Sequence, residues 1–165
     1  MYDAIVLWLH ILSAVAFIGP QFFLAFAAVP AMKTIEDVKV RARAMRVMTM
    51  RFGMLGGGAL VVLLVTGLLN YSVHKDEIDT FQRYFITLQI KLTLVLVVVI
   101  LTILHGAVFG RKLQALQESN ASEAEIAKAR QMSMYASIGT LVLSVAILFF
   151  AALLGSAWST SGALR

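Results

Sequence analysis

Four apolar segments, each long enough to cross a membrane, constrain the fold of this sequence more than any other feature. They cover about residues 4–30, 53–73, 84–110 and 134–158. A helix of roughly 20 apolar residues crosses the hydrocarbon core of a bilayer, and in lipid a helix satisfies the hydrogen-bonding groups of its own backbone. The sequence therefore predicts an all-α, integral membrane four-helix bundle.

The composition leaves little of the chain outside the membrane. Of the 165 residues, 60% are hydrophobic and 14% are charged, whereas a soluble domain is roughly half apolar and a quarter charged. We therefore predict a single transmembrane domain over residues 1–165.

The chain contains no cysteine, which excludes disulfides, iron–sulfur clusters and thiolate metal sites. Asp3 stands where a cleavable signal peptide would carry basic residues, so the first apolar segment is predicted to span the membrane.

The net charge of +5 comes from basic residues beside the apolar segments, so it indicates topology rather than nucleic-acid binding. Residues 31–52 contain six Lys or Arg and residues 111–133 contain four, whereas residues 74–83 have two basic residues against three acidic ones. The positive-inside rule therefore predicts that the basic loops 31–52 and 111–133 are cytoplasmic. Both termini are then outside, and the helices run up-down-up-down. We expect both loops to extend the neighbouring helices, with a helix start at Ser122.

Three ionisable side chains, His10, Lys91 and His105, fall inside the predicted helices. Such residues are rare in lipid and mark functional sites. At 100° per residue, His10 shares a stripe of the first helix with Gln21, and Lys91 shares a face of the third helix with His105. The pattern predicts a bundle with a polar seam inside and aliphatic side chains outside.

The depths of the two histidines predict two sites rather than one. By helix rise, His10 and His105 are separated by roughly 20 Å along the membrane normal. The axial nitrogens of one haem are only about 4 Å apart, because each metal–nitrogen bond is near 2 Å. We interpret each histidine as an axial ligand of a b-type haem iron, which allows two haems per chain.

Second ligands can be suggested for each haem. Near the inner face, Met54 and Met134 are at a suitable depth. Near the outer face, His74 could fold back over the bundle, or Lys91 could act as a ligand or as a partner of a haem propionate. Two simpler interpretations remain: the histidines hydrogen-bond to Ser or Thr on neighbouring helices and do nothing else, and Lys91 extends its ammonium group toward the membrane surface.

Methionines and glycines allow further interpretations. The run Met45, Met48, Met50 and Met54 could offer soft ligands to cuprous copper, although such a run is more often flexible packing. Glycine pairs four residues apart, at 53 and 57 and at 106 and 110, suit close helix approach. They are compatible with a homodimer or with room for a flat macrocycle. No internal sequence repeat is evident.

Two stretches resemble a known group of proteins. The first is Leu9-His10-Ile11-Leu12-Ser13-Ala14-Val15-Ala16-Phe17-Ile18-Gly19, and the second runs from Lys91 to His105 and continues to Gly110-Arg111-Lys112-Leu113. Together they resemble small four-helix bacterial membrane proteins of the copper-resistance D group and, more distantly, the HemJ-type protoporphyrinogen oxidases.

The resemblance to the HemJ type implies that haem b is associated with His10, Lys91 and His105. The HemJ-type Leu-Pro-Arg element after the first helix is absent, which argues against porphyrinogen oxidation. The copper-resistance resemblance implies copper movement across a bacterial inner membrane.

Three functional hypotheses follow. The leading one is a b-type haem-binding membrane protein for transmembrane electron transfer or a membrane redox reaction with quinol; if it is an enzyme, it is a haem-dependent oxidoreductase. The second is copper transport or copper handling. The third is an assembly subunit with no ligand.

Overall fold

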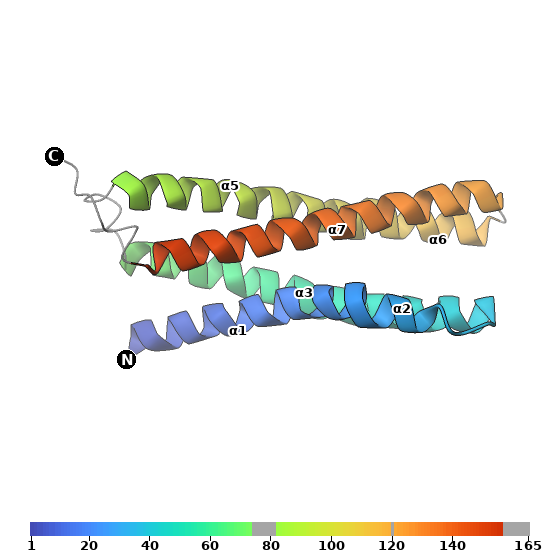
Figure 1. Ribbon diagram of the computed structural model, residues 1–165, viewed down its shortest axis with the longest axis horizontal. Coiled ribbons are helices and arrows are strands. Elements are labelled where there is room, and N and C mark those ends of the chain that lie inside the picture. The colour runs from blue at the N-terminus through green and yellow to red at the C-terminus, as the bar shows by residue number, and fades with distance from the viewer. Residues whose placement is uncertain (74–81, 120, 157–165) are drawn as a thin grey trace. The chain divides into compact units, whose positions relative to one another are not determined.

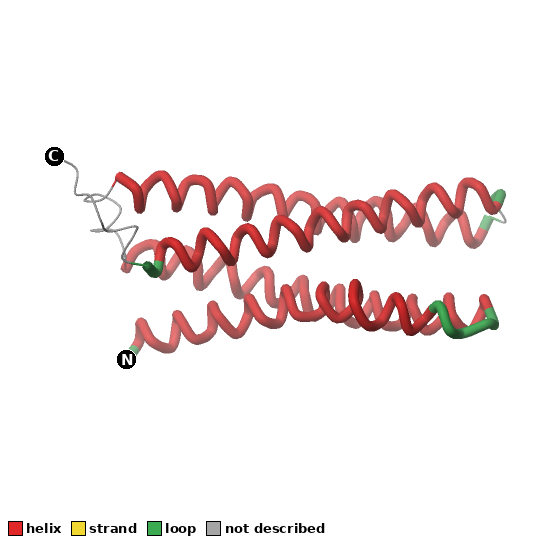
Figure 2. The backbone as a smooth tube through the Cα atoms, viewed as in Figure 1, coloured by secondary structure: helices red, strands yellow, loops and turns green. Residues whose placement is uncertain are grey.

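The computed structural model describes residues 1–73, 82–119 and 121–156, and these residues are almost entirely helical (Figure 1, Figure 2). Within them no strand occurs. Four helices are long and apolar enough to cross a membrane, namely Tyr2–Met32, Val38–Ser72, Gln82–Val108 and Glu123–Leu154. The predicted all-α class and the four apolar helices are therefore confirmed.

The chain divides into two compact units, Met1–Asp76 and Glu77–Arg165. In each unit the described residues form a helical hairpin, which we call hairpin 1 and hairpin 2. Hairpin 1 consists of α1 (Tyr2–Phe23), the π-helix η1 (Leu24–Ala28), α2 (Val29–Met32) and α3 (Val38–Val73). Hairpin 2 consists of α5 (Gln82–Leu104), the π-helix η2 (His105–Gly110), α6 (Arg111–Glu118) and α7 (Glu123–Leu154).

In hairpin 1, α1 and α3 run antiparallel along most of their length (Figure 1). Phe17 is buried, and its ring atom Cδ2 lies 3.8 Å from where Gly56 would carry a Cβ. Further along, the rings of Phe23 and Phe52 meet edge to face, with centroids 5.7 Å apart. These contacts set an antiparallel register, in which higher residue numbers of α1 lie beside lower residue numbers of α3.

Hairpin 2 is built in the same way from α5 and α7. Tyr84 and Leu88 of α5 are buried and pack against Leu154 at the end of α7. Ser144 of α7 is only 1% exposed, and its hydroxyl donates to the carbonyl of Thr140, 2.7 Å away. Burial of a hydroxyl costs little when a backbone carbonyl accepts its proton.

The helices extend beyond a hydrocarbon core, as expected from the loops. With 36 residues, α3 is about 54 Å long, compared with a core of roughly 30 Å. The non-helical connection after α2 is therefore much shorter than the predicted loop 31–52. Asp37 ends that connection, because its Oδ1 accepts hydrogen bonds from the backbone N–H groups of Lys39 and Val40. The helix start at Ser122 is also confirmed, and it carries a capping box with Glu125.

Proline does not interrupt the first helix. Pro20 lies inside α1, and the chain continues through the π-helical turn of η1 and through α2. Proline removes one backbone donor, and local π-helical adjustment can re-satisfy the freed groups in a membrane helix.

The two hairpins share one plan, although no internal repeat is visible in the sequence. The π-helices begin at Leu24 and at His105, which are 81 residues apart. The sequence shows no repeat because equivalent positions share apolar character more than residue identity.

Candidate functional site

His10 is held by a hydrogen bond between the two long helices of hairpin 1. Its Nδ1 lies 2.8 Å from the Thr66 hydroxyl oxygen, which itself lies 2.7 Å from the carbonyl oxygen of Val62. The Thr66 hydroxyl can donate to this carbonyl, to that of Leu63 at 3.3 Å or to His10 Nδ1, so the direction of the bond depends on the tautomer of the ring. In the tautomer in which the Nδ1–H donates to Thr66, the lone pair of the neutral imidazole is on Nε2.

Gly67 makes room for the His10 ring. The ring atom Cε1 lies 3.4 Å from the place of a Cβ at residue 67, and Nδ1 lies 4.0 Å from it. A methyl group would therefore make ordinary contact with the ring, whereas a larger side chain would need the space that the ring occupies. Thr66 and Gly67 together determine the position of this histidine.

This arrangement is the one found around metal-bound histidines, which nearly always donate the second ring N–H to a neighbouring group. Within the described part of the chain there is no group of three or more His, Cys, Asp or Glu that could hold a metal ion. A haem needs only axial ligands from the protein, because its macrocycle supplies the other four nitrogens.

Lys91 and His105 belong to hairpin 2 and lie far apart on one helix. They are 14 residues apart, which corresponds to about 21 Å of helix, so they cannot ligate the same iron. Both are half-buried and share a stripe with Val98, which is 2% exposed. Lys91 lies 14 residues before η2, just as His10 lies 14 residues before η1.

His105 is the first residue of η2, and its Nδ1 is shielded from solvent. Single π-helical turns inside α-helices occur frequently at functional sites. One turn earlier, the Thr102 hydroxyl is buried and has no hydrogen-bond partner among the described residues. Next to His105, Gly106 has no atom within 4 Å of the place of a Cβ. The second predicted site thus lies at a widened helical turn with space beside it.

The other predicted ligands do not gather around these histidines within their own hairpins. Met54 is 65% exposed and Met134 is 50% exposed. At 100° per residue both point away from the stripes that their helices bury, which contain Ala59 and Thr66 on α3 and Thr140 and Ser144 on α7. His74 lies outside the described residues.

Thr66 and Gly67 are the site residues that sequence reasoning did not connect with His10. The available signal was depth, since a short connection between antiparallel helices places Thr66 at the level of His10. Which face of α3 meets α1 depends on packing, and the sequence pattern alone does not reveal it.

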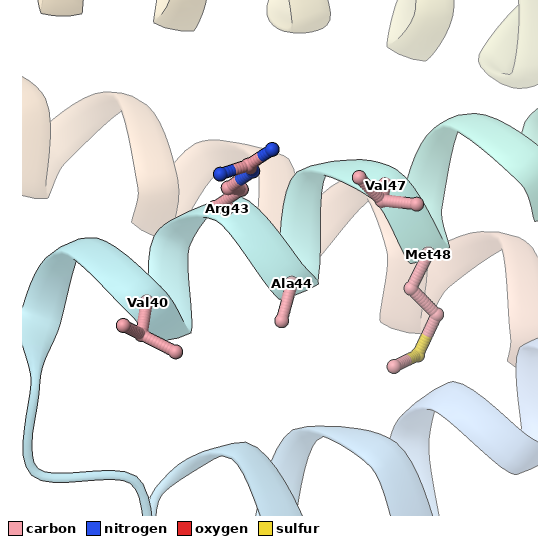
Figure 3. A pocket seen from close by; sticks show the side chains of 5 residues that line it. All are labelled: Val40, Arg43, Ala44, Val47 and Met48. Atoms are coloured by element: carbon pink, nitrogen blue, oxygen red, sulfur yellow. The ribbon is translucent and has the colours of Figure 1, made fainter.

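A separate groove lies on the basic part of α3. Its cavity of about 510 Å³ is lined by Val40, Arg43, Ala44, Val47 and Met48. Figure 3 shows Val40, Ala44 and Met48 pointing to one side of α3 and Arg43 to the other. The lining contains one cation and no imidazole or carboxylate, so it is not part of the histidine site.

No family model, curated protein or solved structure matches this chain. The functional argument therefore depends on the residues themselves.

Proposed function

We propose that this chain is an integral membrane protein that binds b-type haem and carries out transmembrane electron transfer or a membrane redox reaction with quinol. The observation that carries the proposal is the distance of 2.8 Å between His10 Nδ1 and the Thr66 hydroxyl oxygen. When the Nδ1–H is the donor, the lone pair of the neutral ring is on Nε2, as an axial ligand requires. The resemblance of the His10 and Lys91–His105 stretches to haem-associated membrane proteins supports the same assignment.

The proposal gives each polar residue a role. Bound haem would supply a one-electron carrier in the apolar interior. Thr66 orients His10 and increases the basicity of its ring, and Gly67 allows the ring its position. His105 is the candidate ligand of a second haem near the opposite membrane face. Lys91 is the candidate partner of a haem propionate.

We also propose an orientation with both termini outside and helices running up-down-up-down across a bacterial inner membrane. The positive charge of the helix extensions supports this orientation. Between residues 38 and 51, α3 carries five basic residues and no acidic one, and a basic flank of a membrane helix stays on the cytoplasmic side.

The absorption spectrum of the purified protein, expressed with haem supplied, tests the proposal. We expect a Soret band, which His10→Ala should reduce. Thr66→Val should lower the haem affinity by about 10–100-fold, as the loss of partners behind metal-bound histidines does, whereas Thr66→Ser should retain it. A protein without a Soret band would contradict the proposal and would favour an assembly subunit in which His10 only joins two helices.

Copper handling is the second candidate, and the position of two methionines favours it. Met50 and Met54 are one turn apart on α3, and their side chains are 52% and 65% exposed. Thioethers select cuprous copper. Copper bound by the purified protein and lost in the double variant Met50→Leu and Met54→Leu would support this function; a copper content equal to that of the variant would exclude it.

A further inference from the structure

Each hairpin buries one side-chain oxygen atom, and the two atoms belong to equivalent positions of the two hairpins. The atoms are Gln21 Oε1 in α1 and Thr102 Oγ1 in α5, and neither has a hydrogen-bond partner among the residues that the structure describes. The two residues are 81 apart, and each lies three residues before the start of a π-helix. The recurrence in two hairpins of different sequence indicates that the buried oxygen belongs to the architecture.

Thr102 departs from the pattern of the other hydroxyls in these helices. A hydroxyl in a membrane helix ordinarily donates to the carbonyl four residues earlier. Seven hydroxyls of the long helices do so, from Thr49, Thr66, Thr87, Thr93, Ser137, Thr140 and Ser144. The Thr102 hydroxyl makes no such bond to Val98 and is therefore available to a different partner.

Gln21 has its amide orientation fixed. Its Nε2 donates to the Phe17 carbonyl at 3.1 Å, so Oε1 is the end of the amide that points away from the helix backbone. A carbonyl oxygen can only accept, which means that Gln21 needs a hydrogen-bond donor.

Small residues lie near the level of each oxygen. In hairpin 1 the level of Gln21 lies between the Phe17–Gly56 and Phe23–Phe52 contacts, where α3 has glycine at residues 53 and 56. In hairpin 2, Gly106 lies one turn beyond Thr102 on the same side of the helix, with no atom within 4 Å of the place of a Cβ.

We propose that each hairpin binds one O–H donor at this oxygen, either a water molecule or the hydroxyl of a quinol. A buried polar atom without a partner is costly in an apolar medium, and an O–H group meets the needs of both oxygens. The inference does not depend on haem, because it concerns residues that are not ligands.

Whether Tm rises or falls when the oxygen is removed tests the proposal. Thr102→Val and Gln21→Met preserve much of the side-chain volume but remove the oxygen. If an O–H donor is bound, each variant loses that contact and its Tm in detergent falls by roughly 2–4 °C. If the oxygen has no partner, its removal relieves an unfavourable burial and Tm rises. Higher Tm in both variants would overturn the proposal.

Two comparisons make the result specific. Thr102→Ser keeps the hydroxyl and should behave as the unaltered protein, even if Thr102→Val fails to fold; a Ser variant as unstable as the Val variant would contradict the proposal. Added decylubiquinol distinguishes the two donors. If decylubiquinol raises the Tm of the unaltered protein but not that of the two oxygen-free variants, the donor is quinol. If the variants are less stable and decylubiquinol does not change Tm, the donor is water.

Discussion

At His10, a single hydrogen bond joins the two long helices of hairpin 1. The Thr66 hydroxyl lies within hydrogen-bonding distance of both His10 Nδ1 and the Val62 carbonyl. An imidazole buried in an apolar medium without such a bond would be strongly unfavourable. The same bond therefore stabilises the helix pair and prepares Nε2 for a ligand, and these two effects can be separated by substitution.

Substitutions at Gly67 can separate the stabilisation of the helix pair from the binding of a ligand at His10. Its replacement by alanine should leave His10 in place, because the new methyl group would lie 3.4 Å from Cε1. Gly67→Val should displace the ring and weaken the Thr66 hydrogen bond. The expected loss in the free energy of unfolding is about 1–3 kcal/mol, as for other overpacked sites, and the Soret band should decrease with it. Thermal unfolding in detergent measures the first effect and the absorption spectrum the second.

Gly58→Val is the matched control for this substitution. Gly58 lies in the same helix and has no atom within 4 Å of the place of a Cβ, so valine there changes only helix propensity and lipid contact. If Gly58→Val and Gly67→Val destabilise the protein equally, the position of the His10 ring is not determined by Gly67.

At the scale of helices, the beginning of α7 is specified by local chemistry. The Ser122 hydroxyl donates to Glu125 Oε2 at 2.8 Å, and the backbone N–H of Ser122 donates to the same oxygen at 3.1 Å. The Ser122 oxygen accepts the backbone N–H of Glu125 in return. With 32 residues, α7 is about 48 Å long, so this capping box lies outside the hydrocarbon core.

The capping box predicts a pH-dependent helix end. Hydrogen bonds from the Ser122 side chain, and then from its backbone N–H, lower the pKa of the exposed Glu125 carboxyl below its ordinary value of 4.5. A lowered folded pKa means that the stabilisation is present above 4.5 and is lost as the pH falls through the folded pKa. The protection of the amides in the first turn of α7, measured as the ratio of their intrinsic to their observed hydrogen-exchange rates, should therefore fall on acidification below pH 4.5.

Ser122→Ala should remove this dependence and accelerate exchange at neutral pH, with a local cost of about 1 kcal/mol. Ser119→Ala, in the same connection but outside the capping box, should leave exchange in α7 unchanged. An identical acid response in the Ser122 variant would contradict the assignment.

The sequence predicted those features of the helices that depend on local composition. Apolar length predicted all four spans, and Ser122 with its following glutamates predicted the start of α7. The pairing of His10 with Thr66 depends on the rotation and register of α1 against α3, which hydropathy does not encode. The π-helices depend on small shifts of the backbone, and the repeat was hidden because equivalent residues such as His10 and Lys91 or Leu24 and His105 differ chemically.

At the scale of the whole chain, charge is concentrated at one end of each hairpin. Residues 31–52 and 111–133 contain ten of the 14 basic residues, and both stretches join the two long helices of a hairpin. The orientation proposed above places both basic ends on the cytoplasmic side.

Cysteine labelling tests this orientation, because the chain contains no cysteine of its own. Single substitutions Asp3→Cys, Thr34→Cys and Ser119→Cys place one thiol at the N-terminal end and one in each basic connection. A maleimide that cannot cross membranes should label the Asp3 variant in intact cells, and it should label the other two only after permeabilisation. Labelling of Thr34→Cys or Ser119→Cys in intact cells would invert the orientation and move the His10 site to the cytoplasmic half of the membrane.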